Sequence, residues 1–401
     1  MPNATPEDVR EAGELARHAV DCLPGGALAE KLADARGQDR PLRVKLGIDP
    51  TAPDIHLGHS VVLGKLREFQ DAGHVVVLII GDYTARVGDP SGRSALRPML
   101  SGEEIDANAE TFQRQALSVL DADPALLEVR RNSEWLDMPI VELLALLRTT
   151  TVAQMLERDD FAKRYAAQEP VSMLELLYPL LQGYDSVAVR SDIELGGTDQ
   201  KFNLLLGRDI QRAYGQEGQA IMTMPILVGT DGTRKMSKSL GNQIGVTDAP
   251  EEMYGRVMSI PDDAMEEYAR LLPVGTPEDY AGIPPRDAKR ALGRAIVTWL
   301  HGADAAAAAE AHFDRVIVAG EAPEEMDEIE LRAGDGPVHL PALIADAFEI
   351  SRSEARRLID QGGVMLGDRA LAPGEHDAAP ESLDGVVLKV GKRRFRRLRL
   401  R

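Results

Sequence analysis

Six consecutive aliphatic residues, Val75–Ile80, constrain the fold of this chain more than any other stretch. A strand in which every side chain is apolar must be covered on both faces, which is typical of a parallel sheet between two layers of helices. The run is far too short to cross a membrane. It therefore predicts a central strand of an α/β domain.

Strand and helix patterns alternate around this run. We expect further strands at residues 42–48, 193–195 and 221–228. Helices are expected at residues 7–20, 27–36, 58–72, 102–120, 139–147 and 172–183, with another that ends near 214, and the Gly-, Pro- and Arg-rich residues 81–98 are expected to form a loop. This alternation predicts a parallel, doubly wound, Rossmann-like sheet. Ligands bind such sheets outside the carboxyl ends of the strands, so polar residues just after strands are candidate site residues: Asp49, His56, Asp89, Asp199 and Lys238.

The length, 401 residues, exceeds that of one ordinary domain. We expect a Rossmann-like catalytic domain at residues 1–245 and a helical domain at 246–320. Residues 321–337 are acidic and contain Gly and Pro, which suits a linker. A small α+β domain is expected at 338–401, with helices at 340–348 and 352–361 and strands at 364–366 and 386–390.

Charge is distributed unevenly along the chain. The formal net charge is −19, yet residues 337–401 contain 12 basic and 9 acidic side chains, and seven of the last ten residues are basic. An acidic body with a basic end indicates a polyanionic partner bound locally. A solvated tail would give the same count, so charge alone leaves both interpretations open.

A single cysteine, Cys22, excludes a disulfide framework within one chain and fits a reducing compartment. The first residues, MPNATPEDVR, do not have the basic-then-apolar layout of a signal peptide. We therefore expect a cytoplasmic location and no membrane partner.

Two histidines, His56 and His59, lie on one side of a predicted first helical turn. Imidazole N–H groups and the free N–H groups of a helix N-terminus together suit a phosphate, and Gly58 lets the backbone approach a nucleotide closely. A metal site would need more ligands. Because no third His or Cys is nearby in the sequence, we expect phosphate binding and no metal caged by the protein.

Two lysines, Lys235 and Lys238, lie in a loop rich in Gly and Ser that could close over a ligand and open again. Two lysines three residues apart are usually a solvated surface, but their combination with the histidine pair favours a grip on a polyphosphate. The chain contains neither a G-x-x-x-x-G-K-[ST] loop nor a G-x-G-x-x-G fingerprint. Kinase-like P-loop and dinucleotide-binding functions therefore lose their main support.

These motifs resemble those of a known family. His56–His59 (HLGH) and Lys235–Ser239 (KMSKS) are similar to the HIGH and KMSKS signatures of class I aminoacyl-tRNA synthetases. Four further segments resemble bacterial tyrosyl-tRNA synthetases, and the resemblance covers nearly the whole chain: GIDPTAPD at 47–54, GDPSGR at 88–93, Tyr178-x3-Gln182-x2-Asp185, and GGTDQ at 196–200.

The resemblance implies a tyrosine-binding site. Asp89, Tyr178 and Gln182 would hold the ammonium group of L-tyrosine, Gln200 would contact its carboxylate end, and Asp185 would accept a hydrogen bond from its phenol. Tyr178, Gln182 and Asp185 have the spacing of one helix face. Where several family members have a tyrosine that helps to bind the phenol, this chain has Lys45, which leaves the second partner of the phenol unassigned.

The resemblance also implies an ATP site. Gly197 and Asp199 would approach the ribose, although Asp199 could instead be a plain helix N-cap. Arg93 and Arg97 would meet pyrophosphate, and magnesium would arrive with ATP. The implied ATP-binding residues are Gly47, Asp49, His56, Gly58, His59, Gly197, Asp199, Lys235 and Lys238, and the implied catalytic residues are His56, His59, Arg93, Arg97, Lys235 and Lys238.

The C-terminal segment resembles an S4-like RNA-binding module, which implies tRNA(Tyr) as a partner. Its candidate RNA-binding residues are Arg352, Arg356, Arg357, Lys392, Arg393 and Arg394. The family implies a homodimer. The implied function is a tyrosine–tRNA ligase; the alternatives are a tryptophanyl-tRNA synthetase, a small nucleotidylyltransferase, and a non-catalytic RNA-binding protein on a synthetase scaffold.

Overall fold

The computed structural model describes residues 4–51, 55–90, 101–319, 326–331, 336–391 and 394–401. It contains two compact units. The first comprises Met1–Ala249 and Arg256–Leu300, and the second comprises Pro250–Gly255 and His301–Arg401.

The first unit is built on a six-stranded sheet with the order β1-β6-β5-β2-β3-β4. Its strands are β1 (Asp21–Leu23), β2 (Arg43–Ile48), β3 (Val75–Ile80), β4 (Leu127–Arg131), β5 (Ile193–Gly197) and β6 (Ala220–Met224). All neighbouring strands are parallel except β1, which pairs antiparallel with β6 at the edge. The predicted parallel, doubly wound sheet is confirmed.

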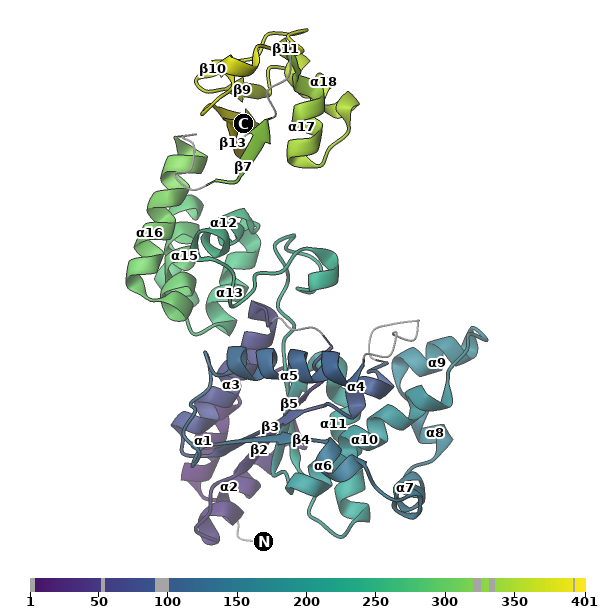
Figure 1. The fold of residues 1–401 in the computed structure, drawn as a ribbon. Helices are drawn as coiled ribbons and strands as arrows, with labels where there is room; N and C mark the ends of the chain where they lie inside the picture. Colours follow the sequence, from purple (N-terminus) through teal and green to yellow (C-terminus); the bar gives the residue numbers. More distant parts are fainter. Residues whose placement is uncertain (1–3, 52–54, 91–100, 320–325, 332–335, 392–393) are drawn as a thin grey trace. The chain divides into compact units, whose positions relative to one another are not determined.

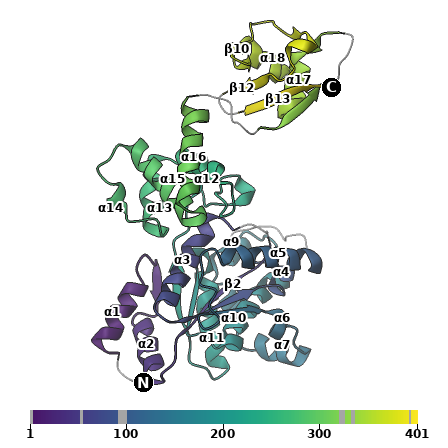
Figure 2. The ribbon, with the colours of Figure 1, turned by 60° about the vertical axis from the view of Figure 1, so that its left-hand side comes forward.

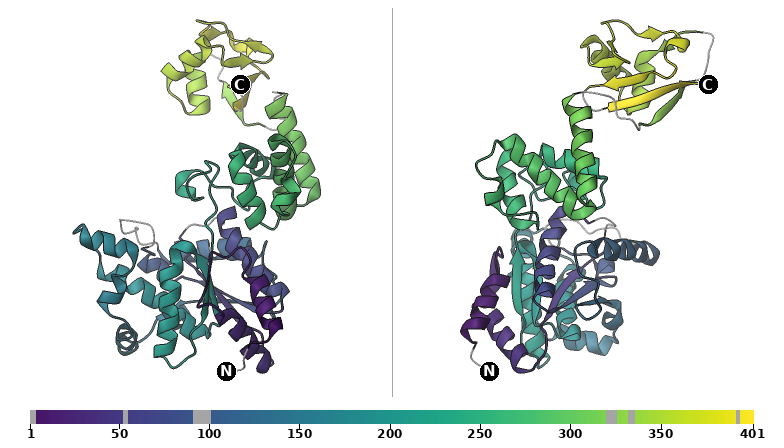
Figure 3. Two further views of the ribbon diagram at one scale, coloured as in Figure 1. Left: turned by 180° about the vertical axis from the view of Figure 1, so that it is seen from behind. Right: turned by 90° about the vertical axis from the view of Figure 1, so that its left-hand side faces the viewer.

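Helices cover both faces of this sheet, as the apolar run of β3 requires. Every residue of β3 is buried. Figure 3 shows α10 (Met173–Val189) and α11 (Lys201–Ala213) on one side of the strands, and α1 (Pro6–Leu15) and α3 (Leu57–Asp71) on the other. The other helices of this part are α2 (Ala27–Gly37), α4 (Thr84–Val87), α5 (Gly102–Ala116), α6 (Ser133–Leu136), α7 (Ile140–Leu147), α8 (Val152–Met155) and α9 (Asp159–Ala166), with 3-10 turns η1 (Thr198–Gln200) and η2 (Lys238–Leu240) (Figure 1).

Several predicted boundaries differ from the structure. The helix predicted at 7–20 ends at Leu15, and the chain then forms the edge strand β1. The predicted loop at 81–98 contains the short helix α4, and its residues 91–98 lie outside the described residues. The strand predicted at 221–228 ends at Met224, directly before Pro225, which cannot donate to a sheet. The helix predicted at 172–183 continues to Val189 in spite of Pro179.

A helical segment follows the sheet domain. It contains α12 (Pro250–Ser259), η3 (Asp262–Ala264), α13 (Met265–Leu271), α14 (Pro277–Tyr280), α15 (Pro285–His301), α16 (Ala303–Phe313) and the π-helical turn η4 (Asp314–Val318). The division between the two compact units runs through this segment. Within the second unit, the hydroxyl of Tyr254 donates to the Glu310 carboxylate at 3.1 Å, and its ring lies edge-on to Phe313.

The C-terminal part of the second unit is a small α+β domain (Figure 2). Its five-stranded sheet has the order β10-β9-β12-β13-β7, and a two-stranded sheet joins β11 to β8. The elements are β7 (Glu328–Leu331), β8 (Val338–His339), α17 (Leu340–Phe348), α18 (Arg352–Asp360), β9 (Val364–Leu366), β10 (Arg369–Ala370), β11 (Asp377–Ala378), η5 (Pro380–Ser382), β12 (Val387–Val390) and β13 (Arg394–Leu400). Buried aliphatic residues such as Leu340, Ile359 and Leu398 form its core.

The acidic segment predicted as a linker contains a strand of this domain. Glu328–Leu331 forms β7, which pairs parallel with β13, the strand made by the basic end of the chain. Arg396, Arg399 and Arg401 form ion pairs with Asp327, Glu328 and Glu330 at 3.1, 3.1 and 2.8 Å. Those arginines therefore belong to a strand and have acidic neighbours, which excludes the solvated-tail interpretation for residues 394–401.

Among the described residues, no helix is both long and apolar enough to cross a membrane.

Candidate active site

The candidate site residues of the first unit gather at the carboxyl ends of the parallel strands. Asp49 follows β2, Asp89 follows the turn after β3, and Gln200 follows β5. The chain runs from β2 outward to β3 and β4, then returns to β5 on the other side of β2. The site therefore lies where the strand order reverses, which is the usual place for a ligand in such a sheet.

Asp49 and Tyr178 form the centre of a polar cluster. The Tyr178 hydroxyl donates to Asp49 Oδ2 at 3.0 Å, and the Thr84 hydroxyl donates to Asp49 Oδ1 at 2.6 Å. Beside them, Gln200 Nε2 donates to Asp89 Oδ2 at 2.9 Å. The structure thus brings together two carboxylates, a phenol and an amide from four separate segments.

Burial disfavours the charged form of these groups. It raises the pKa of Asp49 to about 7, with the negative charge of Asp89 adding to the effect and the hydrogen bond from Thr84 opposing it. It also raises the pKa of Tyr178 well above its ordinary value. A cluster of enclosed carboxylates is suited to receive a cation such as an ammonium group, which would stabilise their ionised forms.

Asp185 lies on the same helix as Tyr178 and is 3% exposed. The Trp135 indole donates to Asp185 Oδ1 at 2.8 Å, and Asn132 Nδ2 donates to Oδ2 at 3.4 Å. Burial raises the pKa of Asp185 to about 6, and the charge of Lys45 is the strongest opposing cause. The carboxylate is held by two donors and keeps lone pairs free for a further donor.

Gln182, the third residue of this helix face, is fixed by amide contacts. Its Oε1 accepts from Asn203 Nδ2 at 2.8 Å, and the same Asn203 amide donates to Gln200 Oε1 at 3.0 Å. Asn203 therefore orients two of the predicted tyrosine-binding residues at once.

Lys45 is fully buried beneath this helix and is paired with Glu194, 2.8 Å away. The two residues are direct neighbours across the parallel strands β2 and β5. The chain therefore places a buried ion pair where the family resemblance suggested a phenol contact.

The two histidines of the HLGH motif lie at the N-terminus of α3. Their rings stack with centroids 3.9 Å apart, and the His56 backbone N–H donates to His59 Nδ1 at 3.2 Å. Burial lowers the pKa of His56 to about 3 and that of His59 to about 4. Both imidazoles are therefore neutral at pH 7 and can act there as hydrogen-bond donors, not as cations. His56 Nδ1 is buried without a partner among the described residues.

The two signature motifs meet in space, although about 180 residues separate them in the sequence. Leu57 N–H donates to the Ile244 carbonyl at 2.9 Å, and His56 forms an antiparallel bridge with Gly245. A Cβ on Gly58 would lie 2.9 Å from His56 Nδ1 and 3.5 Å from the Met236 Cβ. Gly58 is thus required by the packing of the two motifs on each other, in addition to any approach of a nucleotide.

The lysine loop is anchored by buried residues and exposes its charges. Met236 is 4% exposed and Asn242 is 3% exposed, whereas Lys235 and Lys238 are exposed. Asn242 Oδ1 accepts from Ser237 N–H at 2.8 Å, and its Nδ2 donates to the Lys235 carbonyl at 3.1 Å. The loop is therefore held at defined points, and the side chains of Lys235 and Lys238 are exposed on it.

The structure also locates the residues predicted to meet the ATP ribose. Asp199 lies in η1, and α11 begins after it with Gln200 at its N-cap and without a side-chain cap bond, so Asp199 is not a helix N-cap. Its Oδ2 lies 3.9 Å from Lys235 Nζ. Gly197 ends β5, and a Cβ on Gly47 of β2 would have no atom of the described residues within 4 Å apart from its own chain neighbours.

Four predicted site residues, Arg93, Arg97, Lys392 and Arg393, lie outside the described residues. The other candidate RNA-binding residues belong to the C-terminal domain. Arg352, Arg356 and Arg357 are exposed on α18, and Arg394 begins β13 with its guanidinium 5.7 Å from the Phe348 ring.

Sequence reasoning missed the residues that hold the site residues in place. These are Thr84, Asn132, Trp135, Glu194, Asn203 and Asn242. Each of these residues either lies in a different segment of the chain from the residue it holds or belongs to no recognisable sequence motif, so the sequence did not single it out. Only Asn242, three residues after Ser239 of the KMSKS motif, stands close enough to a signature to have been singled out.

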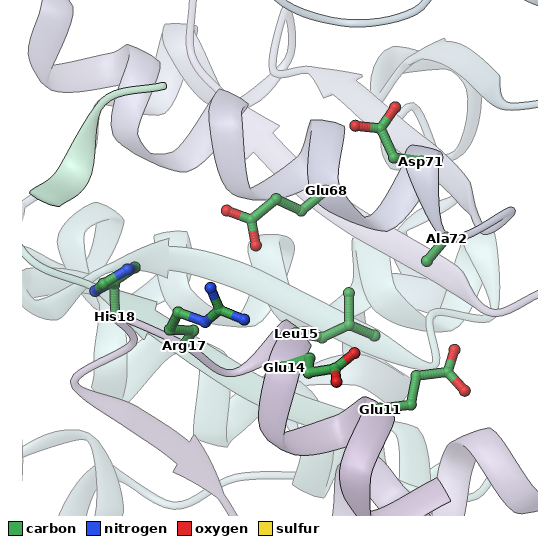
Figure 4. Close-up of a pocket in the computed structure, with 8 residues that line it drawn as sticks. All are labelled: Glu11, Glu14, Leu15, Arg17, His18, Glu68, Asp71 and Ala72. Atoms are coloured by element: carbon green, nitrogen blue, oxygen red, sulfur yellow. The ribbon is translucent and has the colours of Figure 1, made fainter. Parts of the chain in front are cut away.

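A separate surface hollow of about 410 Å³ lies between α1 and α3 (Figure 4). It is lined by Glu11, Glu14, Leu15, Arg17, His18, Glu68, Asp71 and Ala72. It contains none of the predicted site residues, so the candidate site is the cluster at the strand ends.

Comparisons with known proteins agree with this assignment. The model of the family "tRNA synthetases class I (W and Y)" matches residues 37–317. The tyrosine–tRNA ligase of Thermotoga maritima is 50% identical over 405 residues, covering 98% of each chain. That of Bordetella pertussis is 48% identical over 407 residues, covering 99% of this chain and 98% of its own.

A solved structure shares the fold. Tyrosyl-tRNA synthetase from Archaeoglobus fulgidus, complexed with L-tyrosine, aligns with a TM-score of 0.61 and 23% identity, covering 75% of this chain and 99% of that one. At this identity the likeness concerns the fold alone. The family model matches most of the chain, and a tyrosine–tRNA ligase is 50% identical to it over nearly its full length. The chain therefore belongs to the class I tRNA synthetases of the tryptophan and tyrosine type, and within them to the tyrosine–tRNA ligases.

Proposed function

We propose that this chain is a tyrosine–tRNA ligase, which activates L-tyrosine with Mg-ATP to tyrosyl-adenylate and then transfers tyrosine to the 3′ end of tRNA(Tyr). The observation that carries the proposal is the junction of three groups at the strand ends. These are the carboxylate cluster around Tyr178, the stacked His56–His59 pair and the lysine loop beside it. Near-full-length identity to tyrosine–tRNA ligases supports the same conclusion.

The carboxylate cluster is the proposed receptor for the substrate ammonium. Asp89, Tyr178 and Gln182 would hold it, with Asp49 contributing through its bond to Tyr178. An ammonium close to Asp49 would favour the ionised carboxylate, which reverses the upward shift of its pKa. Gln200, which is already bonded to Asp89, would lie near the substrate carboxylate.

Asp185 is the proposed reader of the phenol. Because Trp135 and Asn132 hold it in place, its orientation would not depend on the substrate. Phenylalanine lacks the hydroxyl and would leave a buried carboxylate short of a donor. A site of this kind rejects the analogue by about 10⁴–10⁵, a figure that comes from tyrosyl enzymes themselves.

In the first step the tyrosine carboxylate oxygen attacks the α-phosphorus of ATP. A bond forms between that oxygen and the α-phosphorus, the bond to the β-phosphate oxygen breaks, and pyrophosphate leaves with the electron pair. The carboxylate is already a nucleophile, so positioning and charge stabilisation carry most of the catalysis. Magnesium comes as part of the Mg-ATP substrate.

Two kinds of donor would stabilise the phosphates. His56 and His59, neutral at pH 7, would donate hydrogen bonds, while Lys235 and Lys238 would supply the positive charge. Asp199 would accept from the ribose, with Gly47 leaving room for the nucleotide and Gly197 leaving room for the Asp199 carboxylate, whose Oδ1 lies 2.6 Å from where a Cβ would stand. Arg93 and Arg97 remain proposed pyrophosphate contacts. Loss of one such donor typically costs about 3–4 kcal/mol of barrier.

In the second step a ribose hydroxyl at the tRNA terminus attacks the adenylate carbonyl, and AMP leaves. The C-terminal domain would bind tRNA through phosphate contacts from the exposed arginines of α18 and from Arg394, together with Lys392 and Arg393. The domain division at 245, 320 and 337 stays a proposal, with β7 counted with the C-terminal domain.

We also propose that two copies associate and act in the cytoplasm. Large apolar side chains are exposed on α7, α8, α9 and the start of α10: Ile140, Val141, Leu144, Val152, Tyr165 and Met173. Exposed apolar clusters of this kind mark association surfaces. Light scattering from the purified chain should give twice the chain mass, and a monomer at micromolar concentration would refute the dimer.

The direct test of the proposed function is charging of tRNA. The purified chain is incubated with ATP, an equimolar mixture of amino acids and total bacterial tRNA, and the esters released from the tRNA are identified by mass spectrometry. Tyrosine alone, on tRNA(Tyr) alone, is expected. A tryptophan ester would instead indicate a tryptophan enzyme, and no ester from folded protein would indicate a non-catalytic RNA-binding protein.

A further inference from the structure

Lys45 and Glu194 form a buried charged network under the proposed tyrosine site. Their side chains are 0% and 1% exposed and lie 2.8 Å apart. Lys45 Nζ also donates to the Gln182 carbonyl at 2.9 Å and to Ser186 Oγ at 2.8 Å. An ammonium has three N–H donors, so these three partners use all of them.

This network excludes Lys45 as a ready partner for the substrate hydroxyl. To donate to a phenol, the ammonium would have to leave Glu194 or one of its two contacts on α10. Glu194 is equally engaged, because its Oε2 accepts from Ser186 Oγ at 3.1 Å and from Gln219 Nε2. The pair thus ties strands β2 and β5 to the helix that carries Tyr178, Gln182 and Asp185.

The partners of Lys45 on α10 flank the recognition residues. The carbonyl it binds belongs to Gln182, and the hydroxyl belongs to Ser186, the residue after Asp185. Gln182 Nε2 also points to Glu194 Oε1 at 3.4 Å. A shift of the ammonium would therefore move the helix turn that presents both Gln182 and Asp185.

We propose that Lys45 is a positioning residue for recognition of tyrosine: clamped by Glu194, it fixes the turn Gln182–Ser186 and supplies the buried positive charge that balances Asp185. This inference rests on the proposed function, since it explains how that site reads a phenol in a chain with lysine at this position. Lys45 is the strongest influence that keeps the pKa of Asp185 from rising further, and an ionised Asp185 is the better acceptor.

The variant that tests this role removes both charges and keeps both shapes: Lys45→Met with Glu194→Gln. The double change avoids leaving one buried charge unpaired, which would unfold the site for a trivial reason. Lys65→Met is the matched control, because Lys65 is also buried, at 2% exposure, but pairs with Glu68 on α3. Amino-acid-dependent ATP–pyrophosphate exchange is measured with tyrosine and with phenylalanine from pH 6 to pH 9.

The expected result has three parts. At pH 7 the double variant loses about 10- to 100-fold in kcat/KM for tyrosine, a change of about 1.4–2.7 kcal/mol in the barrier. Its preference for tyrosine over phenylalanine falls as well, by less than the loss with tyrosine because both amino acids need Gln182, and its KM for ATP stays within about twofold. Lys45 lowers the pKa of Asp185 more strongly than Glu194 raises it, so removal of both charges raises that pKa on balance. The pH at which tyrosine activation falls therefore moves upward, and activity at pH 9 recovers more than activity at pH 7.

Three results would overturn the inference. One is a folded double variant with wild-type preference and pH profile. Another is an equal loss with both amino acids and an unmoved pH profile, which would mean that Lys45 only stabilises the fold. A third is a similar change of preference in the Lys65→Met control. A wild-type chain that activates no tyrosine would fail in the same assay before any variant is compared, and it would overturn the proposed function and this inference together.

Discussion

Asn242 offers the most informative single substitution, because it holds the lysine loop and is not among the residues proposed to contact a substrate. Its side chain is buried and makes three short contacts. Nδ2 donates to Asp231 Oδ2 at 2.9 Å and to the Lys235 carbonyl at 3.1 Å, and Oδ1 accepts from Ser237 N–H at 2.8 Å. Asn242→Ala removes all three and frees the backbone on both sides of Met236.

The magnitude follows from these contacts. A hydrogen bond of this kind contributes a net ~0.5–1.5 kcal/mol, and part of the loss is returned where water reaches the exposed loop. We therefore expect the ordered loop to be destabilised by about 2 kcal/mol. At about 1.4 kcal/mol for each factor of ten, this corresponds to a loss of roughly 30-fold in kcat/KM for ATP.

Pyrophosphate exchange with ATP and tyrosine varied in turn measures this effect. The Asn242→Ala variant should lose kcat/KM for ATP by the factor given, with the KM for tyrosine almost unchanged, because the tyrosine site lies on α10. Gln243→Ala is the matched control, since that residue contributes its backbone carbonyl to Arg256 and keeps it in the variant. A kcat/KM for ATP within twofold of the wild-type value would refute this reasoning. A rise in the KM for tyrosine by the same factor as the loss of kcat/KM for ATP would also refute it.

Four further predictions concern the ammonium cluster, the histidine motif and the C-terminal domain. The KM for tyrosine should rise by about fivefold as pH falls from 7 to 6, because Asp49, with a pKa of about 7, becomes neutral and attracts the ammonium less; Asp49→Asn should flatten this pH dependence. The same upward shift of the pKa means that the stability contributed by Asp49 is fully present below its ordinary pKa of 3.8 and is lost as pH rises through about 7. Over that pH interval, the temperature of thermal unfolding should therefore fall less in Asp49→Asn than in the wild type. Gly58→Ala should lower the exchange rate by about 10- to 100-fold, because the new Cβ meets the His56 ring and such overpacking costs ~1–3 kcal/mol; Gly64→Ala, on the same helix, where a Cβ would meet nothing in the described residues beyond its own helix backbone and chain neighbours, should leave the rate unchanged. Removal of residues 326–401 should preserve tyrosine-dependent exchange and impair tRNA charging, since the cut removes β7 together with the sheet it joins.

Each of these has a contrary outcome. A wild-type pH profile in Asp49→Asn would remove Asp49 from ammonium binding. Equal exchange rates in Gly58→Ala and Gly64→Ala would show that the packing of His56 against Gly58 does not affect catalysis. If a folded chain without residues 326–401 lost exchange and tRNA charging equally, the C-terminal domain would not serve tRNA charging alone.

The central sheet could be predicted because its signal is local. Val75–Ile80 is apolar at every position, so both faces must be covered, and the strand has the predicted bounds. β1 was missed because it is a three-residue edge strand. β7 was missed because Glu328–Leu331 is acidic and gains its stability from the arginines of β13, about 70 residues away.

The candidate site also has features that the sequence predicts and features that depend on the folded chain. The spacing of Tyr178, Gln182 and Asp185 could be assigned to one helix face from the sequence alone. Their partners could not, because Asp49 is 129 residues from Tyr178 and Trp135 is 50 residues from Asp185. The neutral state of His56 and His59 was equally out of reach, since it depends on burial that only the folded chain provides.

ATP–pyrophosphate exchange without tRNA, with tyrosine, phenylalanine and tryptophan in parallel, tests the central claim most directly. The chemistry proposed for the strand-end cluster predicts exchange with tyrosine, and exchange with phenylalanine lower by about 10⁴ or more. Exchange that is strongest with tryptophan, or comparable with phenylalanine and tyrosine, would contradict the reading of the phenol by Asp185 and the network beneath it.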